Sequence, residues 1–143
     1  VSKNMKKGDN ILLSLDRVKE KGAQEKAYND AAGYNAKFNK NILNVVNKHI
    51  ESDFAGSDFE HLAFYNDDKE RIEMHLKANR DIEVVSPHLG EKFIIKEGET
   101  IHTENSHKFT DAHIRELADF AGLKIRETIT DEKGWFSIVW LTK

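Results

Sequence analysis

Thr100-Ile-His-Thr-Glu-Asn-Ser-His-Lys-Phe109 is the stretch around which the other elements of the chain can be placed. If it forms a strand, its side chains alternate between two faces, and one face carries a carboxylate and a hydroxyl two residues apart. These groups, on Glu104 and Ser106, can point at one small polar ligand. The alternative is a solvated strand face that ends at a helix N-cap. The two predicted faces are Ile101, Thr103, Asn105 and His107 on one side, and His102, Glu104, Ser106 and Lys108 on the other.

The composition indicates an ordinary globular domain with a polar surface. The 143 residues, 38% hydrophobic and 33% charged, are enough for one domain with a core. With 22 basic and 25 acidic residues the formal charge is −3, so we expect no nucleic-acid partner. The absence of cysteine excludes a disulfide scaffold, a thiolate zinc site and a cysteine nucleophile.

Neither a membrane span nor a signal peptide is visible in the sequence. We therefore expect a cytoplasmic protein with no membrane partner. The chain begins at Val1, without a methionine, and enters a predicted strand after only ten residues. We interpret it as part of a longer protein, and a processed natural start is the alternative.

The apolar run 11–15 is typical of a strand that is buried on both faces of a sheet covered by helices. Asp16 follows at its carboxyl end, where ligands bind in open α/β sheets. It is therefore either close to an active site or the cap of a turn.

Residues 23–50 carry apolar side chains at spacings of three and four, which predicts one amphipathic helix or two helices that meet near Gly33. A glycine inside a helix costs about 1 kcal/mol relative to alanine, which favours a break at Gly33 or a close packing contact there. The expected apolar stripe is Ala27, Ala31, Tyr34, Phe38, Ile42, Val45 or Val46, and Ile50.

Alternating patterns predict an antiparallel patch in the middle of the chain, with strands over 59–65, 71–78, 81–85 and 92–96. Residues 110–122 then predict a helix with a Thr110 N-cap, a stripe of Ile114, Leu117 and Phe120, and a terminal Gly122. The last two strands, 123–129 and 135–141, form a hairpin. In the second strand of the patch we expect Ile72, Met74, Leu76 and Ala78 to point inward, and Glu73, His75 and Lys77 outward.

Five blocks of sequence stand in a fixed order along nearly the whole chain. They are Leu15-Asp16-Arg17-Val18-Lys19; Ala27-Tyr28-Asn29-Asp30-Ala31-Ala32-Gly33 with Phe38-Asn39; Phe59-Glu60-His61; Ile72-Glu73-Met74; and Thr103-Glu104-Asn105-Ser106 with Lys108-Phe109. In these blocks and their separations the chain resembles the histidine-specific methyltransferases, which N-methylate the α-amine of histidine on the way to ergothioneine.

The resemblance implies an α/β fold: the C-terminal part of a Rossmann-like class I methyltransferase sheet with an inserted α+β substrate-binding lobe. Residues 1–20 would hold the last parallel strand of the core. Residues 21–108 would form the substrate-binding lobe, with its helix and antiparallel strands. Residues 109–143 would add a helix and a terminal hairpin that complete the methyltransferase sheet. The change of periodicity near residue 52 separately predicts that the lobe and the sheet are distinct.

The resemblance also implies a set of substrate-binding residues. Tyr28 would help to hold the substrate carboxylate, Met74 would line the pocket, and Glu104 and Ser106 would bind the imidazole. Asn105, between them, belongs to the same predicted set. This agrees with the chemistry of a neutral imidazole, since Glu104 can accept from its N–H while Ser106 donates to its other nitrogen. No catalytic residue is predicted.

The departure from the family pattern concerns the cofactor, S-adenosylmethionine. The glycine-rich turn between a strand and a helix that would hold it is missing, because the glycines are scattered along the chain. We therefore expect no cofactor-binding residue here and a cofactor site that lies mainly in a preceding part of the enzyme. The full-length protein would be the active methyltransferase and this chain alone inactive; the alternative is a protein that has lost catalysis.

Seven histidines raise the possibility of a metal site at His102, Glu104 and His107. His107 would oppose the other two across the strand, so no metal site is predicted.

The favoured function is the recognition of histidine, as substrate, by an S-adenosylmethionine-dependent N-methyltransferase. A methyltransferase for another aromatic amino acid is one alternative, although an apolar residue in place of Glu104 would have indicated it. A non-catalytic amino-acid-binding module is the other.

Overall fold

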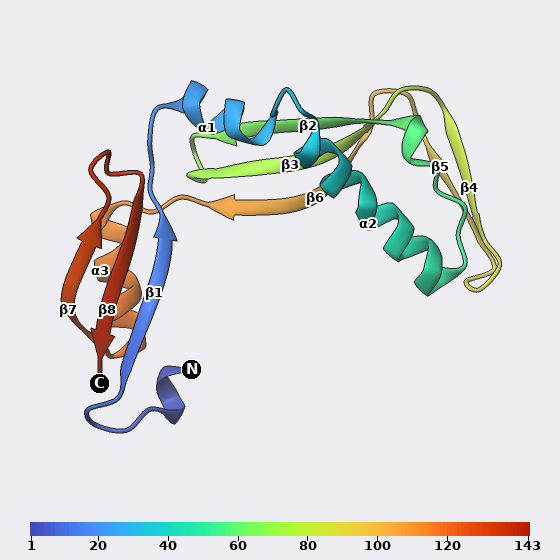
Figure 1. Cartoon of the computed structure of the whole chain (residues 1–143). Coiled ribbons are helices and arrows are strands. Elements are labelled where there is room, and N and C mark those ends of the chain that lie inside the picture. Colours follow the sequence, from blue (N-terminus) through green and yellow to red (C-terminus); the bar gives the residue numbers. More distant parts are fainter. The chain divides into compact units, whose positions relative to one another are not determined.

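The computed structural model describes Val1–Lys143, and these residues divide into two units. Unit 1 consists of Val1–Glu20, Asp67–Glu70 and His107–Lys143, and unit 2 of Lys21–Asn66 and Arg71–Ser106. The elements of each are labelled in Figure 1, and together they form a mixed α/β structure with antiparallel sheets. Ile11 and Met74 lie in different sheets, which confirms the separation predicted from the change of periodicity.

The sheet of unit 1 has three strands in the order β1-β8-β7. The central strand is antiparallel to both neighbours, so the two outer strands run parallel to each other. The pairing of β7 with β8 confirms the predicted terminal hairpin. The bounds are β1 (Asn10–Asp16), β7 (Lys124–Thr130) and β8 (Phe136–Thr142).

Strand β1 is an edge strand of this sheet, and the prediction that it is buried on both faces is wrong. Leu15 is buried, but Leu12 has 69% of its surface exposed. One face packs against α3 (Asp111–Ala121), whereas the other has no helix of unit 1 on it. The apolar core on the covered face contains Leu15, Ile114, Ala118, Leu123, Val139 and Leu141.

Helix α3 has the predicted ends. The Thr110 side chain accepts a hydrogen bond from the backbone N–H of His113, and Gly122 ends the helix with φ of 63°. Its predicted apolar stripe is only partly correct, because Ile114 is buried while Phe120 is 94% exposed. Only one side of α3 touches the sheet, and Phe120 lies away from it.

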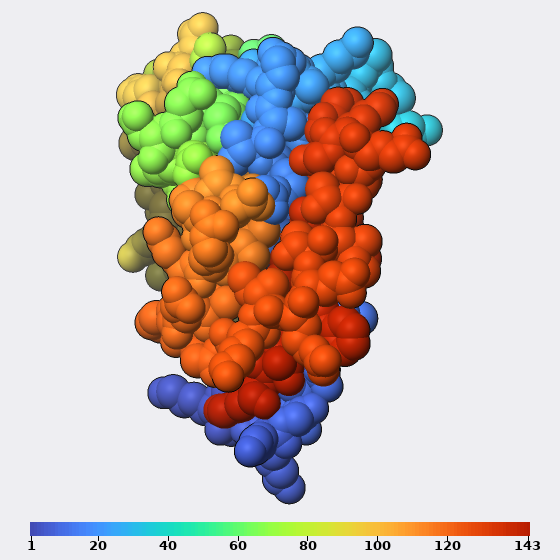
Figure 2. Space-filling view, turned by 90° about the vertical axis from the view of Figure 1, so that its left-hand side faces the viewer, coloured from blue at the N-terminus to red at the C-terminus, as the bar shows by residue number.

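The two ends of the chain meet in unit 1. A short 3₁₀ helix, η1 (Ser2–Asn4), opens the chain. The Lys143 ammonium group donates to the carbonyl oxygen of Ser2 at 2.6 Å, and the Gly8 N–H donates to the carbonyl oxygen of Lys143 at 2.9 Å. Figure 2 shows the N-terminal segment, in dark blue, beside the C-terminal one, in dark red.

Unit 2 begins with two helices, α1 (Lys21–Tyr28) and α2 (Tyr34–Ile50), so the two-helix alternative is correct. The break falls at Gly33, whose φ of 70° lies in the left-handed region that glycine adopts without strain. The Asp30 carboxylate accepts hydrogen bonds from the N–H groups of Tyr34 and Asn35 at the start of α2. Hydrogen bonds from Asn35 and Tyr34 lower the pKa of Asp30 below its usual value.

The apolar stripe predicted for α2 is not its buried face. Asn39 and Leu43 are the buried residues of this helix, whereas Tyr34 is 72% and Phe38 65% exposed. The core contact is made by Leu43, which packs against Phe59 and Leu76 of the sheet. Phe38, with the exposed Ile42 and Val45, borders a cavity that is described below and does not contact the core.

The main sheet of unit 2 has the order β2-β3-β6, and a separate pair, β4-β5, stands beyond it. The inward positions of β3 are confirmed, since Ile72, Met74, Leu76 and Ala78 are all buried. Glu73, predicted to point into solvent, is buried as well. The bounds are η2 (Gly56–Asp58), β2 (Phe59–Asn66), β3 (Arg71–Ala78), β4 (Ile82–Ser86), β5 (Glu91–Ile95) and β6 (Thr100–His107).

None of the helices combines the length and the apolar character needed to cross a bilayer.

Candidate functional site

Three of the five predicted site residues meet in unit 2. Tyr28 ends α1, and its phenolic oxygen lies 2.7 Å from the hydroxyl oxygen of Ser106 on β6. Tyr28 also packs against a buried cluster on β2 and β3 that includes Met74, which is 2% exposed. The structure therefore brings together a phenol, a hydroxyl and a thioether from three separate parts of the sequence.

Glu104 lies beside a cavity of about 150 Å³ that α2 and β6 share. One wall carries apolar side chains of α2 that are exposed to solvent, among them Phe38 and Ile42. A half-buried carboxylate next to apolar side chains suits a flat ring that has an N–H group at its edge. The full lining is Phe38, Asn39, Asn41, Ile42, Val45, Thr103 and Glu104.

In strand β6, exposed and half-buried side chains alternate, and this alternation shifts by one residue between Thr103 and Glu104. These neighbours are both half-buried and both line the cavity, whereas a regular strand would send them to opposite faces. A shift of this kind is typical of a β-bulge, which re-aims a side chain. From Glu104 onward the alternation resumes, so Ser106 shares its face and the exposed Asn105 does not.

The phase change corrects the prediction that His102 shares a face with Glu104 and Ser106. The His102 ring stacks on that of His75, with ring centroids 4.4 Å apart. His75 follows Met74 on β3 and therefore lies on the opposite face of the sheet from Met74, Tyr28 and Ser106.

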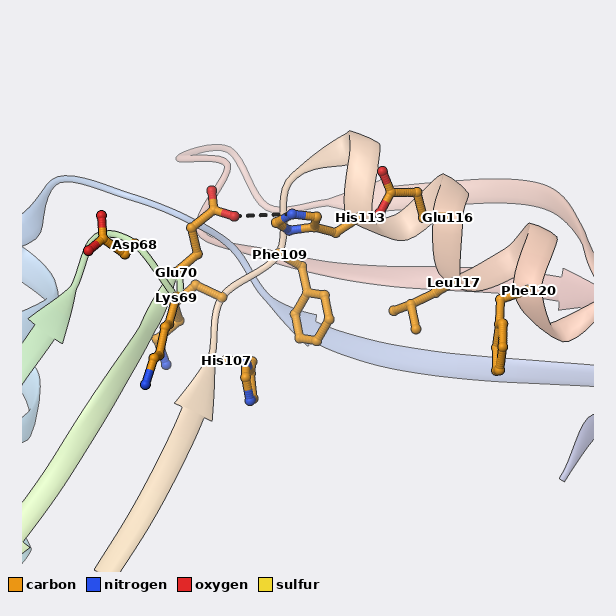
Figure 3. A pocket seen from close by; sticks show the side chains of 10 residues that line it. Asp68, Lys69, Glu70, His107, Phe109, His113, Glu116, Leu117 and Phe120 are labelled. Carbon is orange, nitrogen blue, oxygen red and sulfur yellow. Dashed lines mark ion pairs between the residues drawn. The ribbon is translucent and has the colours of Figure 1, made fainter. Parts of the chain in front are cut away.

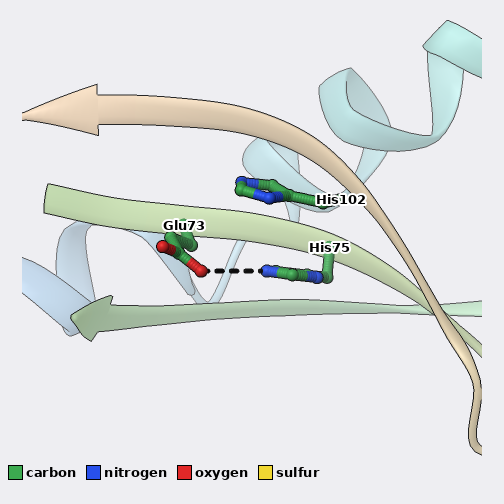
Figure 4. Close-up of side chains that lie close together, drawn as sticks. All are labelled: Glu73, His75 and His102. Carbon is green, nitrogen blue, oxygen red and sulfur yellow. Dashed lines mark hydrogen bonds and ion pairs between the residues drawn. The ribbon is translucent and has the colours of Figure 1, made fainter. Parts of the chain in front are cut away.

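A cluster that was not predicted occupies this opposite face (Figure 4). One ligand atom each from Glu73, His75 and His102 lies within 4.8 Å of the others, a spacing at which a metal ion is conceivable. However, the two imidazole rings are stacked at an interplanar angle of 13°, so their in-plane lone pairs do not converge. The Phe64 ring continues the stack beside His75, at 5.4 Å between centroids.

The carboxylate of this cluster is already paired with a cation. Arg71 donates to Glu73 Oε1 from Nη2 at 2.7 Å and from Nε at 2.9 Å. Hydrogen bonds from Arg71 outweigh the cost of burial and lower the pKa of Glu73 to about 2. A metal ion would have to compete with the guanidinium and unstack the rings, so we assign the cluster to packing between strands.

A larger cavity, of about 620 Å³, lies in unit 1 (Figure 3). Phe109, Leu117 and Phe120 form a row along it, and His113 pairs with Glu70 at 3.1 Å near one end. None of the five predicted site residues lines it. The smaller cavity beside Glu104 is the better candidate, because chemistry and not volume decides what a site recognises.

The sequence allows Asp16 to be either an active-site residue or the cap of a turn. Its carboxylate pairs with the ammonium groups of Lys19 at 2.6 Å and Lys108 at 2.9 Å, and the Lys108 side chain is 1% exposed. Burial raises the pKa of Asp16, but the hydrogen bonds from the two lysines outweigh it and leave the pKa below its usual value. These contacts favour a structural role, in which Asp16 fixes the segment that follows β6.

The sequence interpretation missed Phe38, Ile42 and Asn39, which line the cavity. Their periodicity was visible, but spacing alone does not distinguish a helix face that packs on a core from one that borders a cavity. Asn39 could have indicated that the buried face of α2 differs from the apolar stripe, because this polar residue lies one helical turn before the buried Leu43.

The chain is similar to known proteins over nearly its whole length. A family model described as histidine-specific methyltransferase, SAM-dependent, matches residues 1–143, the whole chain. The histidine N-alpha-methyltransferase of Mycolicibacterium smegmatis is 42% identical over 132 residues, which cover 92% of this chain and 41% of that protein. The protein of the same name from Mycobacterium tuberculosis is 37% identical over 134 residues, 94% of this chain and 42% of that one.

A third relative has another substrate in its name. An L-tryptophan methyltransferase of Psilocybe serbica is 28% identical over 139 residues, covering 95% of this chain and 38% of that protein. The chain thus spans about two fifths of the length of these relatives.

Proposed function

Because the chain belongs to the family of histidine-specific, S-adenosylmethionine-dependent methyltransferases, we propose that it carries the residues by which such an enzyme recognises histidine for methylation of the α-amine. The observation that carries this proposal is the position of Glu104, a half-buried carboxylate beside an apolar-walled cavity. At about 150 Å³ this cavity is smaller than the roughly 300–1,000 Å³ of complete ligand sites, so it suits a side chain and not a whole ligand.

In the proposed complex the imidazole of histidine enters the cavity beside α2. Phe38 and Ile42 contact its faces, and Glu104 accepts a hydrogen bond from its N–H. Ser106, which lies outside the lining of this cavity, donates to the second nitrogen of the ring. Met74, which also lies outside that lining, borders the substrate from β3, and Tyr28 holds the substrate carboxylate. Asn105 stays a predicted member of the set, although it points away from Glu104 and Ser106.

The cofactor has no visible cradle among the residues present. The connection that follows β1, Arg17–Glu20, contains no glycine, and the glycines with positive φ are Gly8, Gly33, Gly90, Gly98, Gly122 and Gly134, all outside helix and strand interiors. We therefore propose that S-adenosylmethionine is held mainly by residues that this chain does not contain. Calorimetric titration of the chain with the cofactor should show no micromolar binding, and such binding would contradict the proposal.

We further propose that residues 1–20 and 109–143 belong to a Rossmann-like class I methyltransferase sheet and that 21–108 form its inserted substrate-binding lobe. The parallel direction of β1 and β7 on either side of antiparallel β8 supports this. A product that enters ergothioneine synthesis and a cytoplasmic location stay predictions, as does the absence of a nucleic-acid or membrane partner.

Tryptophan is the second candidate substrate, because one relative is named as a methyltransferase for it. An indole has an N–H donor but no acceptor nitrogen, so it would leave the hydroxyl of Ser106 without its proposed partner. A histidine-binding module without catalysis is the candidate from another class. It would bind histidine but not support methyl transfer when joined to a cofactor-binding part.

Glu104→Ala tests the proposal in an enzyme that contains this chain, for example a hybrid in which it replaces the matching part of the M. smegmatis relative. A charge-assisted hydrogen bond contributes about 1.5–3 kcal/mol, so kcat/KM for histidine should fall roughly ten- to a hundredfold. Glu91→Ala, at an exposed strand position, is the matched control and should stay within about twofold. An unchanged ratio of histidine to tryptophan use in Glu104→Ala would overturn the assignment.

A further inference from the structure

Asn39 and His61 form a polar bridge between the helices and the sheet of unit 2. Asn39, on α2, is 3% exposed, and its Nδ2 lies 2.9 Å from His61 Nδ1 and 3.0 Å from the carbonyl oxygen of His75. His61, on β2, places its Nε2 2.9 Å from the carbonyl oxygen of Tyr28. The function proposed above assigns no role to His61, and it gives Asn39 only a place in the cavity lining.

The partners fix the direction of each hydrogen bond. A carbonyl oxygen can only accept, so His61 Nε2 donates to Tyr28, and Nδ1 of the neutral ring is then an acceptor. Asn39 Nδ2 supplies the hydrogen that Nδ1 needs and gives its second hydrogen to the carbonyl oxygen of His75. If the Asn39 amide were flipped, its Oδ1 would face the carbonyl oxygen of His75, and two acceptors would be in contact. The orientation of the amide is therefore determined.

The amide oxygen of Asn39, Oδ1, contacts Thr103 on β6. Thr103 Oγ1 lies 2.6 Å from Asn39 Oδ1 and 2.9 Å from the carbonyl oxygen of Met74. Both neighbours are acceptors, so the hydroxyl donates. Thr103 precedes Glu104 at the point where the alternation of β6 changes phase, and Asn39 therefore holds the strand at that point.

These contacts close a circuit through four elements. It runs from Tyr28 on α1 to His61 on β2, to Asn39 on α2 and to Thr103 on β6, and the 2.7 Å contact between Ser106 and the Tyr28 hydroxyl closes it. We propose that Asn39 and His61 are positioning residues that hold Tyr28 at one side of the histidine pocket and the Thr103–Glu104 segment at the other. This inference rests on the proposed function for the identity of the ligand, but not for the circuit itself.

Fluorine NMR tests the circuit without any ligand. The chain has three tyrosines, so incorporation of 3-fluorotyrosine gives few signals, and Tyr28→Phe assigns one of them. His61→Leu and Asn39→Leu should move the Tyr28 signal, while that of Tyr34, which is 72% exposed, stays in place. His61→Gln should restore the wild-type position, because the glutamine amide offers one donor and one acceptor at similar spacing. His88→Leu, at an exposed histidine, is the matched control.

The consequence for the pocket is tested in the hybrid enzyme. KM for histidine should rise about five- to tenfold in His61→Leu and Asn39→Leu, and stay within about twofold in His61→Gln. Circular dichroism shows whether each leucine variant folds. If one does not, the folded His61→Gln variant is the deciding test, because a displaced Tyr28 signal in that variant overturns the inference.

An unmoved Tyr28 signal in both folded leucine variants would overturn the inference as well, and so would an unchanged KM. An error in the proposed function would give a result that can be distinguished from an error in this inference. A wild-type hybrid that does not use histidine would refute the substrate assignment while the fluorine spectra still report the circuit.

Discussion

The phenolic oxygen of Tyr28 and the hydroxyl oxygen of Ser106 are 2.7 Å apart, and one hydrogen atom joins them. Each group has a single O–H to donate. If Ser106 donates to the imidazole and Tyr28 to the substrate carboxylate, no hydrogen is left between the two oxygens. In the proposed complex, binding of histidine therefore weakens or opens this contact, because the O–H that joins the two oxygens is then donated to the substrate.

A double-mutant cycle on the unliganded chain measures this contact. Tyr28→Phe and Ser106→Ala should each lower the free energy of unfolding, with a coupling energy of about 0.5–1.5 kcal/mol between them. Urea unfolding of the wild type, both single variants and the double variant gives the value. Ser106→Ala paired with Tyr34→Phe, whose tyrosine is exposed, is the control and should be additive. Additivity in the Tyr28 cycle as well would contradict the contact.

Glu104→Ala combined with Met74→Val should shift the preference of an enzyme containing this chain from histidine toward tryptophan. The first change removes the acceptor for the imidazole N–H, and the second removes volume at a residue that is 2% exposed. Steady-state kinetics with both amino acids give the ratio of kcat/KM values. Met74→Val alone should keep the preference for histidine, and a double variant that still prefers histidine as strongly as the wild type would argue against the pocket.

Glu73 should make stability depend on pH in the acid range. Its pKa of about 2 in the folded chain lies below the ordinary value of 4.5, so its ionised form favours the folded state. This contribution is fully present above about pH 5 and is lost as the pH falls from about 4.5 to 2. Glu73→Gln should cost about 1.5–3 kcal/mol at pH 7, and this difference from the wild type should shrink toward pH 2. Urea unfolding at several pH values checks this, with Glu60→Gln, on the exposed side of β2, as control.

Gly33→Ala should destabilise the chain by about 1 kcal/mol. The glycine has φ of 70°, and an alanine there is strained even though its Cβ would meet nothing within 4 Å. Gly56→Ala is the matched control, because the nearest atom to its Cβ would be 3.9 Å away and its φ is not in the left-handed region. It should be neutral or stabilising by about 0.4–1 kcal/mol. Equal melting temperatures for the two variants would contradict the assigned break between α1 and α2.

Hydrophobic periodicity and capping residues predicted the helices and strands well where only one face of a segment packs against the core. The inward residues of β3 and the ends of α3 are examples, since period-two alternation and capping residues act within a few positions. The same logic located the break at Gly33. It also placed Glu104 and Ser106 on one face, and the burial pattern of β6, with Asn105 exposed between two half-buried residues, agrees with this.

Patterns failed where burial depends on distant partners. Leu12 belongs to an apolar run, yet it is exposed because β1 is an edge strand of its sheet. Glu73 alternates as a solvent residue, yet it is buried where β2 lies opposite, and Asn66 of that strand donates to its carboxylate at 3.1 Å. Phe38 has the spacing of a core residue but borders a cavity. None of these outcomes is encoded in the spacing of the residues concerned, because each depends on which segment lies opposite.

The phase change in β6 has a consequence for how substrate preference can diverge among related proteins. Glu104 faces the cavity because the backbone between it and Thr103 departs from regular alternation. A relative could keep the glutamate and still lose the carboxylate from its pocket, if a one-residue deletion nearby restored the regular pleat and turned the side chain to the other face. If Glu104 recognises the substrate as proposed, evolution can therefore exchange one amino-acid substrate for another through strand geometry, and an identical residue at this position does not guarantee an identical preference.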